Sequence, residues 1–253
     1  MLLQNINPIY VLQPLIVTVA MVALLAYWHY KKSLTKWVML YSLLAYAAAI
    51  IIKYVFQILT AMPVIRTGNP YYEGVYLGLQ TVVLEVGLAY LFARYAISKK
   101  RMTAKEASGY GIGLAFWENG VLLGALSLFS IVATYAVLAS GGTAASAVYS
   151  SLLETQPSLF YPLSQALPLV CLGILERASS TIVHVAWGYL VFMAAFHKRK
   201  KYLALALPLG LVDFFVPFEG ALGLVTLELV VFTIAIIGLA MVFVVRREIR
   251  KKP

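Results

Sequence analysis

Long apolar segments separated by short basic clusters constrain this chain more than any other feature of its sequence. The hydrocarbon core of a bilayer is crossed by ~20 residues of α-helix, in which every backbone hydrogen bond is satisfied internally. Only 12% of the residues are charged and the mean hydropathy is +0.87, which lies outside the range of soluble domains. A transmembrane barrel would show short segments of alternating polarity instead. The sequence therefore predicts an all-α fold, a polytopic transmembrane helix bundle.

We expect about seven spans in a single integral membrane domain that comprises residues 1–253. They run approximately over residues 9–27, 37–59, 75–97, 109–138, 168–196, 202–218 and 222–245. The connection between the fourth and fifth spans is the longest, and we expect a short interfacial helix over residues 144–153 before Pro157 and Pro162 end it.

Basic residues gather in alternate connections and at the C-terminus. Most of the 20 Lys and Arg residues fall in four clusters, around Lys31–Lys36, Lys99–Lys105, Lys198–Lys201 and Arg246–Lys252. Cytoplasmic connections carry such an excess, so we expect the N-terminus outside and the C-terminus in the cytoplasm. This distribution accounts for the net charge of +10 without a nucleic-acid partner. The expected surroundings are the lipid bilayer of the plasma (cell) membrane of a prokaryote.

Four glycines follow one face of the fourth span. Gly109, Gly113, Gly120 and Gly124 include two GxxxG pairs, a spacing that lets helix backbones approach closely in lipid. Packing within the chain is the favoured interpretation. The alternative is that this face forms an oligomer or a complex with another protein.

Ionisable side chains lie near the middle of four different spans, where a charge is costly and persists only with a partner or a function. They are Glu85, Glu118, His184 and Asp213, with Asn119 beside Glu118 and Arg177 seven positions before His184. Such a set can supply a general base, a proton carrier and donors to an oxyanion, as hydrolysis requires. It can equally be a network that locks helices together. Lys53, in the second span, is a further buried charge that we expect to pair with Asp213 or Glu228.

Some of these side chains are also candidate ligands of a metal ion. The candidate ligands are His184, Glu118 and Asp213, whereas His29 and His197 lie beside basic clusters. Zinc normally takes three or four Cys, His or carboxylate ligands. Zinc is therefore feasible only if carboxylates supply most of the ligands, and the sequence leaves the cofactor open.

Two stretches resemble known membrane peptidases. Residues 111–120, which read GIGLAFWENG, resemble the second motif of the PrsW and YhfC families, as does the order Glu176-Arg177, His184 and Asp213. These families belong to the superfamily of the CAAX-processing proteases, and the resemblance covers about residues 75–218. It implies an intramembrane endopeptidase whose catalytic residues are Glu85, Glu118, Asn119, Arg177, His184 and Asp213. The chain departs from the family patterns where acidic, basic or histidine residues are usual, at Leu84, Leu88, Leu114 and Leu209.

A second resemblance leads to a different function. The glycine-spaced fourth span and the stretch His184-Val185-Ala186-Trp187-Gly188 resemble the anterior-pharynx-defective subunit of γ-secretase, a member of the same superfamily. This resemblance implies a noncatalytic scaffold that binds the transmembrane helix of a partner. A peptidase would instead bind the transmembrane helix of a substrate, in a cavity that we expect to reach the mid-membrane cluster from the cytoplasmic side. A transporter is a third alternative, although we see no inverted repeat.

Overall fold

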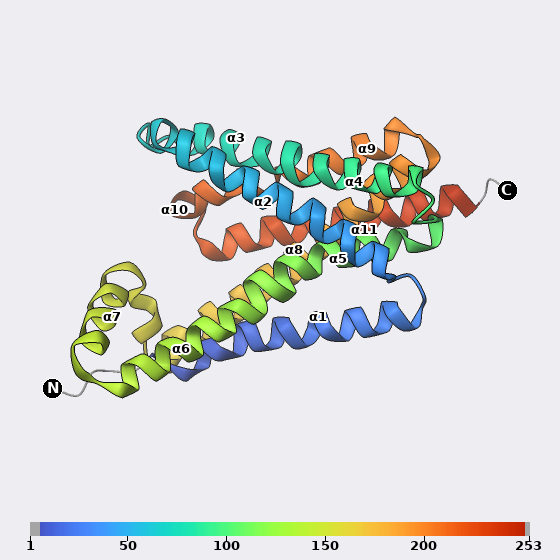
Figure 1. Ribbon diagram of the computed structural model, residues 1–253. Coiled ribbons are helices and arrows are strands. Elements are labelled where there is room, and N and C mark those ends of the chain that lie inside the picture. Colours follow the sequence, from blue (N-terminus) through green and yellow to red (C-terminus); the bar gives the residue numbers. More distant parts are fainter. Residues whose placement is uncertain (1–5, 251–253) are drawn as a thin grey trace.

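The computed structural model describes residues 6–250 of the chain, and all regular structure in this range is helical. Seven helical stretches are long and apolar enough to cross a membrane (Figure 1). The predicted fold class, an all-α bundle of membrane-spanning helices, is confirmed, and each of the seven expected spans coincides with one of these stretches.

The described elements follow one another in seven membrane-spanning stretches and one connecting hairpin. The first three stretches are η1 (Pro8–Val11) with α1 (Leu12–Tyr30), α2 (Lys36–Ile65), and α3 (Pro70–Gln80) with η2 (Thr81–Val86) and α4 (Gly87–Ser98). The fourth comprises η3 (Ala104–Glu106), α5 (Ala107–Ala115), η4 (Phe116–Leu126) and α6 (Ser127–Ser140), and α7 (Gly142–Thr155) and η5 (Pro157–Phe160) connect it to the fifth. The last three are α8 (Leu163–His197), then α9 (Lys200–Ala206) with η6 (Leu207–Phe218) and α10 (Glu219–Leu222), and α11 (Leu224–Arg250).

Helix starts follow ordinary capping chemistry. The Thr35 hydroxyl accepts a hydrogen bond from the Val38 N–H at the start of α2, and the Asn69 side chain does the same for Tyr71 N–H at the start of α3. Such caps satisfy backbone donors that the first helical turn leaves free. The predicted helix over residues 144–153 is α7, which begins at Gly142, and both Gly142 and the preceding Gly141 have positive φ. These two glycines let the chain reverse sharply after α6.

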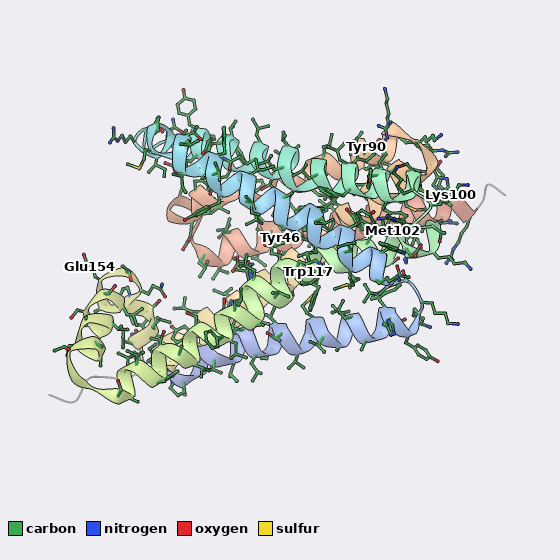
Figure 2. The ribbon with its side chains drawn as sticks, in the orientation of Figure 1. Tyr46, Tyr90, Lys100, Met102, Trp117 and Glu154 are labelled. Atoms are coloured by element: carbon green, nitrogen blue, oxygen red, sulfur yellow. The ribbon has the colours of Figure 1, made fainter. Side chains whose placement is uncertain are left out.

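The bundle is closed at one end and splayed at the other (Figure 1). We call the end that carries Lys31, Lys99, Lys198 and Arg246 the basic end. In Figure 1, α2, α3–α4 and α11 lie on one side and α1 with α6 lies on the other, while α8 packs against α11, α5 and α4. The two sides diverge away from the basic end. Figure 2 labels Lys100 near the basic end and Glu154 of α7 at the opposite end.

The hydrophobic core occupies the basic half of the molecule. Every residue of α5 is buried, and its Tyr110 packs against Phe192 of α8 with ring centroids 5.7 Å apart. The Tyr110 hydroxyl donates to the Ala89 carbonyl oxygen at 2.8 Å, which satisfies the polar atom inside the core. The ionisable cluster therefore lies where dense packing gives way to the splayed half.

The glycine face of the fourth span is covered within the chain. A Cβ added at Gly109 would lie 1.9 Å from the Ser33 carbonyl oxygen, and one at Gly113 would lie 2.4 Å from Ser42 Oγ. Gly120 and Gly124 likewise face Met21 and Thr18 of α1. The favoured interpretation, intramolecular helix packing, is the one the structure shows. This packing gives no support to an oligomer contact through these glycines.

Three spans depart from α-helical geometry where they carry acidic residues of the cluster. Glu85 lies in the π-helical segment η2, and Glu118 lies in the π-helical segment η4. Asp213 lies in the 3₁₀ segment η6. Short π-helical segments are rare and occur frequently at functional sites. They also rotate the side chains that follow, so the facing of Glu85 and Glu118 cannot be taken from a 3.6-residue period.

Candidate active site and metal centre

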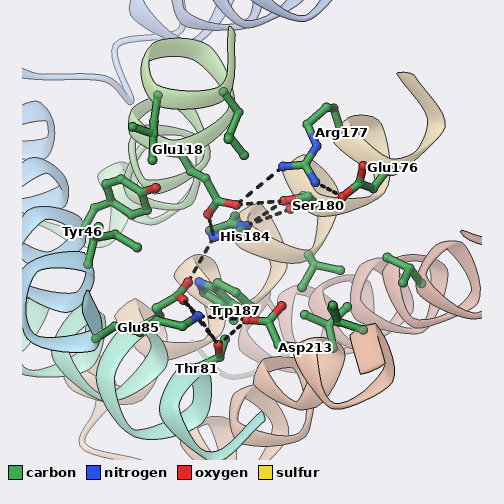
Figure 3. A pocket seen from close by; sticks show the side chains of 18 of the residues that line it. Tyr46, Thr81, Glu85, Glu118, Glu176, Arg177, Ser180, His184, Trp187 and Asp213 are labelled. Atoms are coloured by element: carbon green, nitrogen blue, oxygen red, sulfur yellow. Dashed lines mark hydrogen bonds and ion pairs between the residues drawn. The ribbon is translucent and has the colours of Figure 1, made fainter. Parts of the chain in front are cut away.

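A cavity of about 280 Å³ lies at the centre of the bundle and collects the ionisable side chains (Figure 3). Six segments contribute to its wall, namely α2, η2, η4, α8, η6 and α11. The charged residues of the wall are two cations and five carboxyl groups: Lys53, Arg177, Glu85, Glu118, Glu176, Asp213 and Glu228. This excess of acidic groups favours the binding of a cation.

The imidazole ring of His184 is held in place through one nitrogen, and its other nitrogen faces two carboxylates. Its Nδ1 lies 2.9 Å from the Ser180 carbonyl oxygen, an acceptor, so Nδ1 carries the proton. The ring also packs on Trp187, with centroids 4.1 Å apart. In the neutral imidazole, Nε2 is then the atom with a free lone pair.

Two carboxylates face that nitrogen. Nε2 of His184 contacts Glu118 Oε2 and lies 3.6 Å from Glu85 Oε2, yet it makes no hydrogen bond to any residue within 6–250. One ligand atom from each of Glu85, Glu118 and His184 lies within 4.8 Å of the others. Side-chain exposures of 9%, 16% and 7% keep water largely away from all three. Three lone-pair donors that converge in such a place need a proton or a metal ion between them.

The donor set fits a divalent metal ion. One imidazole nitrogen and two carboxylates are ligands that Zn²⁺ and related first-row metals accept, and catalytic zinc sites use three protein ligands with one open position. The Nδ1 contact with a backbone carbonyl is the usual outer contact of a metal-binding histidine. The observation that supports this fit is that His184 Nε2 faces two carboxylates without a hydrogen bond to any residue within 6–250.

Lys53 forms a second cluster beside the first. Its Nζ lies 2.8 Å from Glu85 Oε1, 3.0 Å from Asp213 Oδ2 and 2.9 Å from Thr81 Oγ1. The Thr81 hydroxyl also lies 2.5 Å from Asp213 Oδ2. Of the two partners expected for Lys53, Asp213 is correct and Glu228 is not, and Glu85 is an additional partner. Glu85 thus connects the two clusters, with Oε1 on Lys53 and Oε2 toward His184.

A polar chain continues from Glu118 to Arg177. The Ser180 hydroxyl lies 3.4 Å from Glu118 Oε1, and Asn119 Nδ2 donates to Ser180 Oγ at 3.2 Å. Arg177 Nη1 lies 3.4 Å from Asn119 Oδ1 and 4.0 Å from Glu118 Oε1, while its Nη2 pairs with Glu176. The guanidinium is therefore held at the cavity wall by amide and carboxylate oxygens.

All six residues that the sequence singled out, Glu85, Glu118, Asn119, Arg177, His184 and Asp213, belong to this connected network. They do not all meet at one point, because they divide between the cluster at His184 and the cluster at Lys53. Glu85 takes the place beside Glu118 and His184 that was expected for Asp213, and Asp213 is held by Lys53 and Thr81. The role of Asp213 as a metal ligand stays a prediction without a supporting contact.

Among the polar wall residues, Thr81 and Tyr46 were missed. Thr81 lies four positions before Glu85 and bonds to both Lys53 and Asp213, and its facing had no regular signal in the sequence because η2 is π-helical. Tyr46 of α2 also lines the cavity, and its place there had no signal in the sequence.

Two of the leucines that depart from the family patterns lie outside the cavity wall. Leu114 and Leu209 are buried in the hydrophobic core, 3% and 2% exposed.

The cavity extends away from the basic end. Its wall includes Leu227 and Val231, near the start of α11, and Leu123 of η4, which lies beyond Glu118 from the basic end. A second hollow of about 320 Å³ shares Leu123, Glu176 and Arg177 and continues toward Ser127 and Ile131 of α6. The expected access from the cytoplasmic side stays a prediction, because it depends on which end of the bundle faces the cytoplasm.

The fold and the site define a class of protein: an integral membrane helix bundle with a carboxylate–histidine donor cluster buried between its spans. The family model that describes the YhfC intramembrane metalloprotease matches residues 16–235, most of the chain. The chain belongs to this family. No curated protein and no solved structure gives a significant match. The finer resemblances, to PrsW, the CAAX-processing proteases and the γ-secretase subunit, stay predictions.

Proposed function

We propose that this protein is an intramembrane metallopeptidase that hydrolyses peptide bonds in membrane-embedded segments of its substrates. The single observation that carries the proposal is the convergence of His184 Nε2 with Glu85 and Glu118 inside a membrane-spanning bundle. Membership of the YhfC family supports the same assignment. The location that we propose is the plasma membrane of a prokaryotic cell, as the sequence led us to expect.

Glu85, Glu118 and His184 would hold the metal ion. Such an ion supplies Lewis-acid polarisation of a carbonyl oxygen when bound. The Ser180 carbonyl fixes the imidazole tautomer, and the Lys53 ammonium fixes Glu85 through Oε1 so that Oε2 faces His184. These contacts position the ligands before substrate binds.

Asp213 and Arg177 are the proposed groups for proton transfer and charge stabilisation. The contacts of Asp213 with described residues all use Oδ2, and its side chain is 32% exposed, so Oδ1 is free to accept a proton from water. The Arg177 guanidinium, oriented by Asn119, lies where it can stabilise an oxyanion.

Apolar residues complete the cavity and define the substrate class. Leu122, Leu123, Val216, Leu227 and Val231 line it around the polar cluster. An apolar, extended peptide segment fits such a wall. Since the cavity extends away from the basic end, we propose that substrate approaches from the outer side of the membrane, with the basic end in the cytoplasm.

Metal content tests the proposal directly. The protein purified in detergent should contain a transition metal at near one equivalent, measured by elemental mass spectrometry. His184→Ala should lose it, whereas His197→Ala, a matched change near the basic end of α8, should retain it. A metal-free wild type after reconstitution with Zn²⁺, Mn²⁺, Fe²⁺ or Co²⁺ would contradict the assignment.

Cleavage distinguishes a peptidase from a scaffold. Membrane proteomes of cells that express the wild type or Glu118→Gln should differ in the fragments of membrane-spanning proteins, and thermal unfolding should show that the variant is folded. A scaffold would give identical fragments and a lower yield of a partner complex. Among residues 6–250, no contact favours the scaffold alternative over the peptidase.

A further inference from the structure

A second polar cavity lies at the basic end, far from the donor cluster. Its volume is about 620 Å³, and it lies among the end of α1, the segment from η3 into α5, the second half of α8 and the end of α11. Five of its wall residues are cations: Lys31, Lys32, Lys105, Arg246 and Arg250. None of the wall residues within 6–250 is acidic.

Acidic residues elsewhere at this end are engaged with other partners. Glu106 accepts hydrogen bonds from Thr103 and Thr35, and Glu248 pairs with Arg199 and Lys201. None of the five cations forms an ion pair with a carboxylate in the part of the chain that the structure describes. Their charge is therefore uncompensated and available to an anion.

Hydrogen bonds between the segments hold the base of the cavity together. The Ser33 hydroxyl donates to the Lys105 carbonyl oxygen at 2.8 Å and accepts from the Gly109 N–H at 3.0 Å, which fixes the turn after α1 against α5. Arg246 donates to Ser108 Oγ and lies over the Tyr189 ring, 5.0 Å from its centroid. Ser33, Ser108 and Tyr189 are buried, so the base of the cavity is packed and polar.

A shallow apolar groove on the surface of α11 adjoins this cavity. The two share Arg246, and the groove is otherwise lined by Ile236, Leu239, Ala240, Val242 and Phe243 of the same helix. A cationic cavity that adjoins an apolar groove matches an amphiphile with an anionic head and a hydrocarbon chain. Basic pockets between helices at a membrane surface bind phosphate-bearing lipid headgroups in this way.

We propose that the basic cavity binds the phosphate headgroup of an anionic membrane lipid, whose acyl chain lies in the groove of α11. The site is independent of the donor cluster, which lies near the middle of the bundle. Because α1, α5, α8 and α11 meet at the cavity, the lipid holds the closed end of the bundle together.

Lipid titration of the purified, delipidated protein tests the proposal. Binding is followed by native mass spectrometry and by thermal unfolding, with phosphatidylglycerol, phosphatidylcholine and glycerol phosphate as probes. We expect phosphatidylglycerol to bind and to raise the unfolding temperature, and the other two to have no comparable effect. Equal effects of glycerol phosphate would mean a site for a soluble anion, and equal effects of phosphatidylcholine would mean nonspecific solvation; either outcome overturns the lipid site.

Two pairs of variants locate the site. Arg246→Gln with Arg250→Gln, and separately Lys32→Gln with Lys105→Gln, should each weaken phosphatidylglycerol binding about 10-fold or more, since each pair removes two of the cations that attract the anionic headgroup. Lys32 and Lys105 are exposed, so the second pair keeps the test valid if loss of Arg246 impairs folding. Lys99→Gln with Lys100→Gln removes the same charge at the same end, outside the cavity, and should bind as the wild type does. Equal weakening in the control pair would overturn the proposal.

Discussion

The Lys53 ammonium lies 3.0 Å from Asp213 Oδ2, which joins the second and sixth spans across 160 positions of sequence. Lys53 also holds Glu85, so one cation from α2 stabilises two carboxylates that the cavity brings together. The pairing keeps Glu85 charged and in place for His184, and it makes Lys53 a positioning residue of the proposed metal site.

Removal of Lys53 should destabilise the protein strongly. Lys53→Met leaves Glu85 and Asp213 without their cation, at a cost on the order of 3 kcal/mol in the free energy of unfolding. Lys201→Met removes a more exposed pair with Glu248 and should cost below about 1 kcal/mol. Thermal unfolding in detergent compares the two. Similar losses in both variants would show that the Lys53 cluster contributes no more than a surface pair.

Two isosteric changes separate the metal ligands from their neighbours. Glu85→Gln should weaken metal binding by at least about 10-fold, since one anionic ligand is lost. Asp213→Asn, which removes a charge that the structure places on Lys53 and Thr81, should retain the metal and lose cleavage. Metal titration of the apo-protein by calorimetry measures both. The reverse result would restore Asp213 as the third ligand in place of Glu85.

Close helix packing should make Gly111 intolerant of any side chain. A Cβ there would lie 2.5 Å from the Val185 carbonyl oxygen, where α5 crosses α8, so Gly111→Ala should cost about 1–3 kcal/mol through forced separation of the helices. Gly220 has no heavy atom within 4 Å of an added Cβ, so Gly220→Ala is the matched control. The unfolding temperatures of the two variants should differ by several degrees. If Gly111→Ala unfolds at the same temperature as Gly220→Ala, the packing where α5 crosses α8 is looser than described.

Thiol labelling of whole cells should reveal which face the cavity opens to. Cys171 is exposed, so it is first replaced by Ser. In that background a membrane-impermeant maleimide added outside should label Leu123→Cys, on the cavity wall, and should leave Lys99→Cys at the basic end unlabelled. Inverted vesicles should reverse the result for Lys99→Cys. Labelling of Lys99→Cys from outside would reverse the proposed orientation.

Hydropathy and charge were enough to predict the seven spans, because a spanning helix has a fixed minimum length and a nonpolar composition that no tertiary contact is needed to recognise. The mid-membrane positions of Glu85, Glu118, His184 and Asp213 follow from the same count along each helix. The glycine spacing correctly indicated close packing, since it depends only on helix geometry. Capping at Thr35 and Asn69 is likewise local, although it was not predicted from the sequence.

Tertiary structure alone decided which of these groups meet. The π-helical segments around Glu85 and Glu118 change the facing that a regular helix would give, so the three-atom donor set could not be assigned from spacing. Lys53 selects Asp213 and Glu85 over Glu228 because of how α2, η2 and η6 pack, which is a relationship between spans. The direction of the cavity depends on the splay of whole helices. Sequence fixes the depth of each side chain in the membrane through helical rise, whereas rotation and neighbours are set by packing between helices distant along the chain.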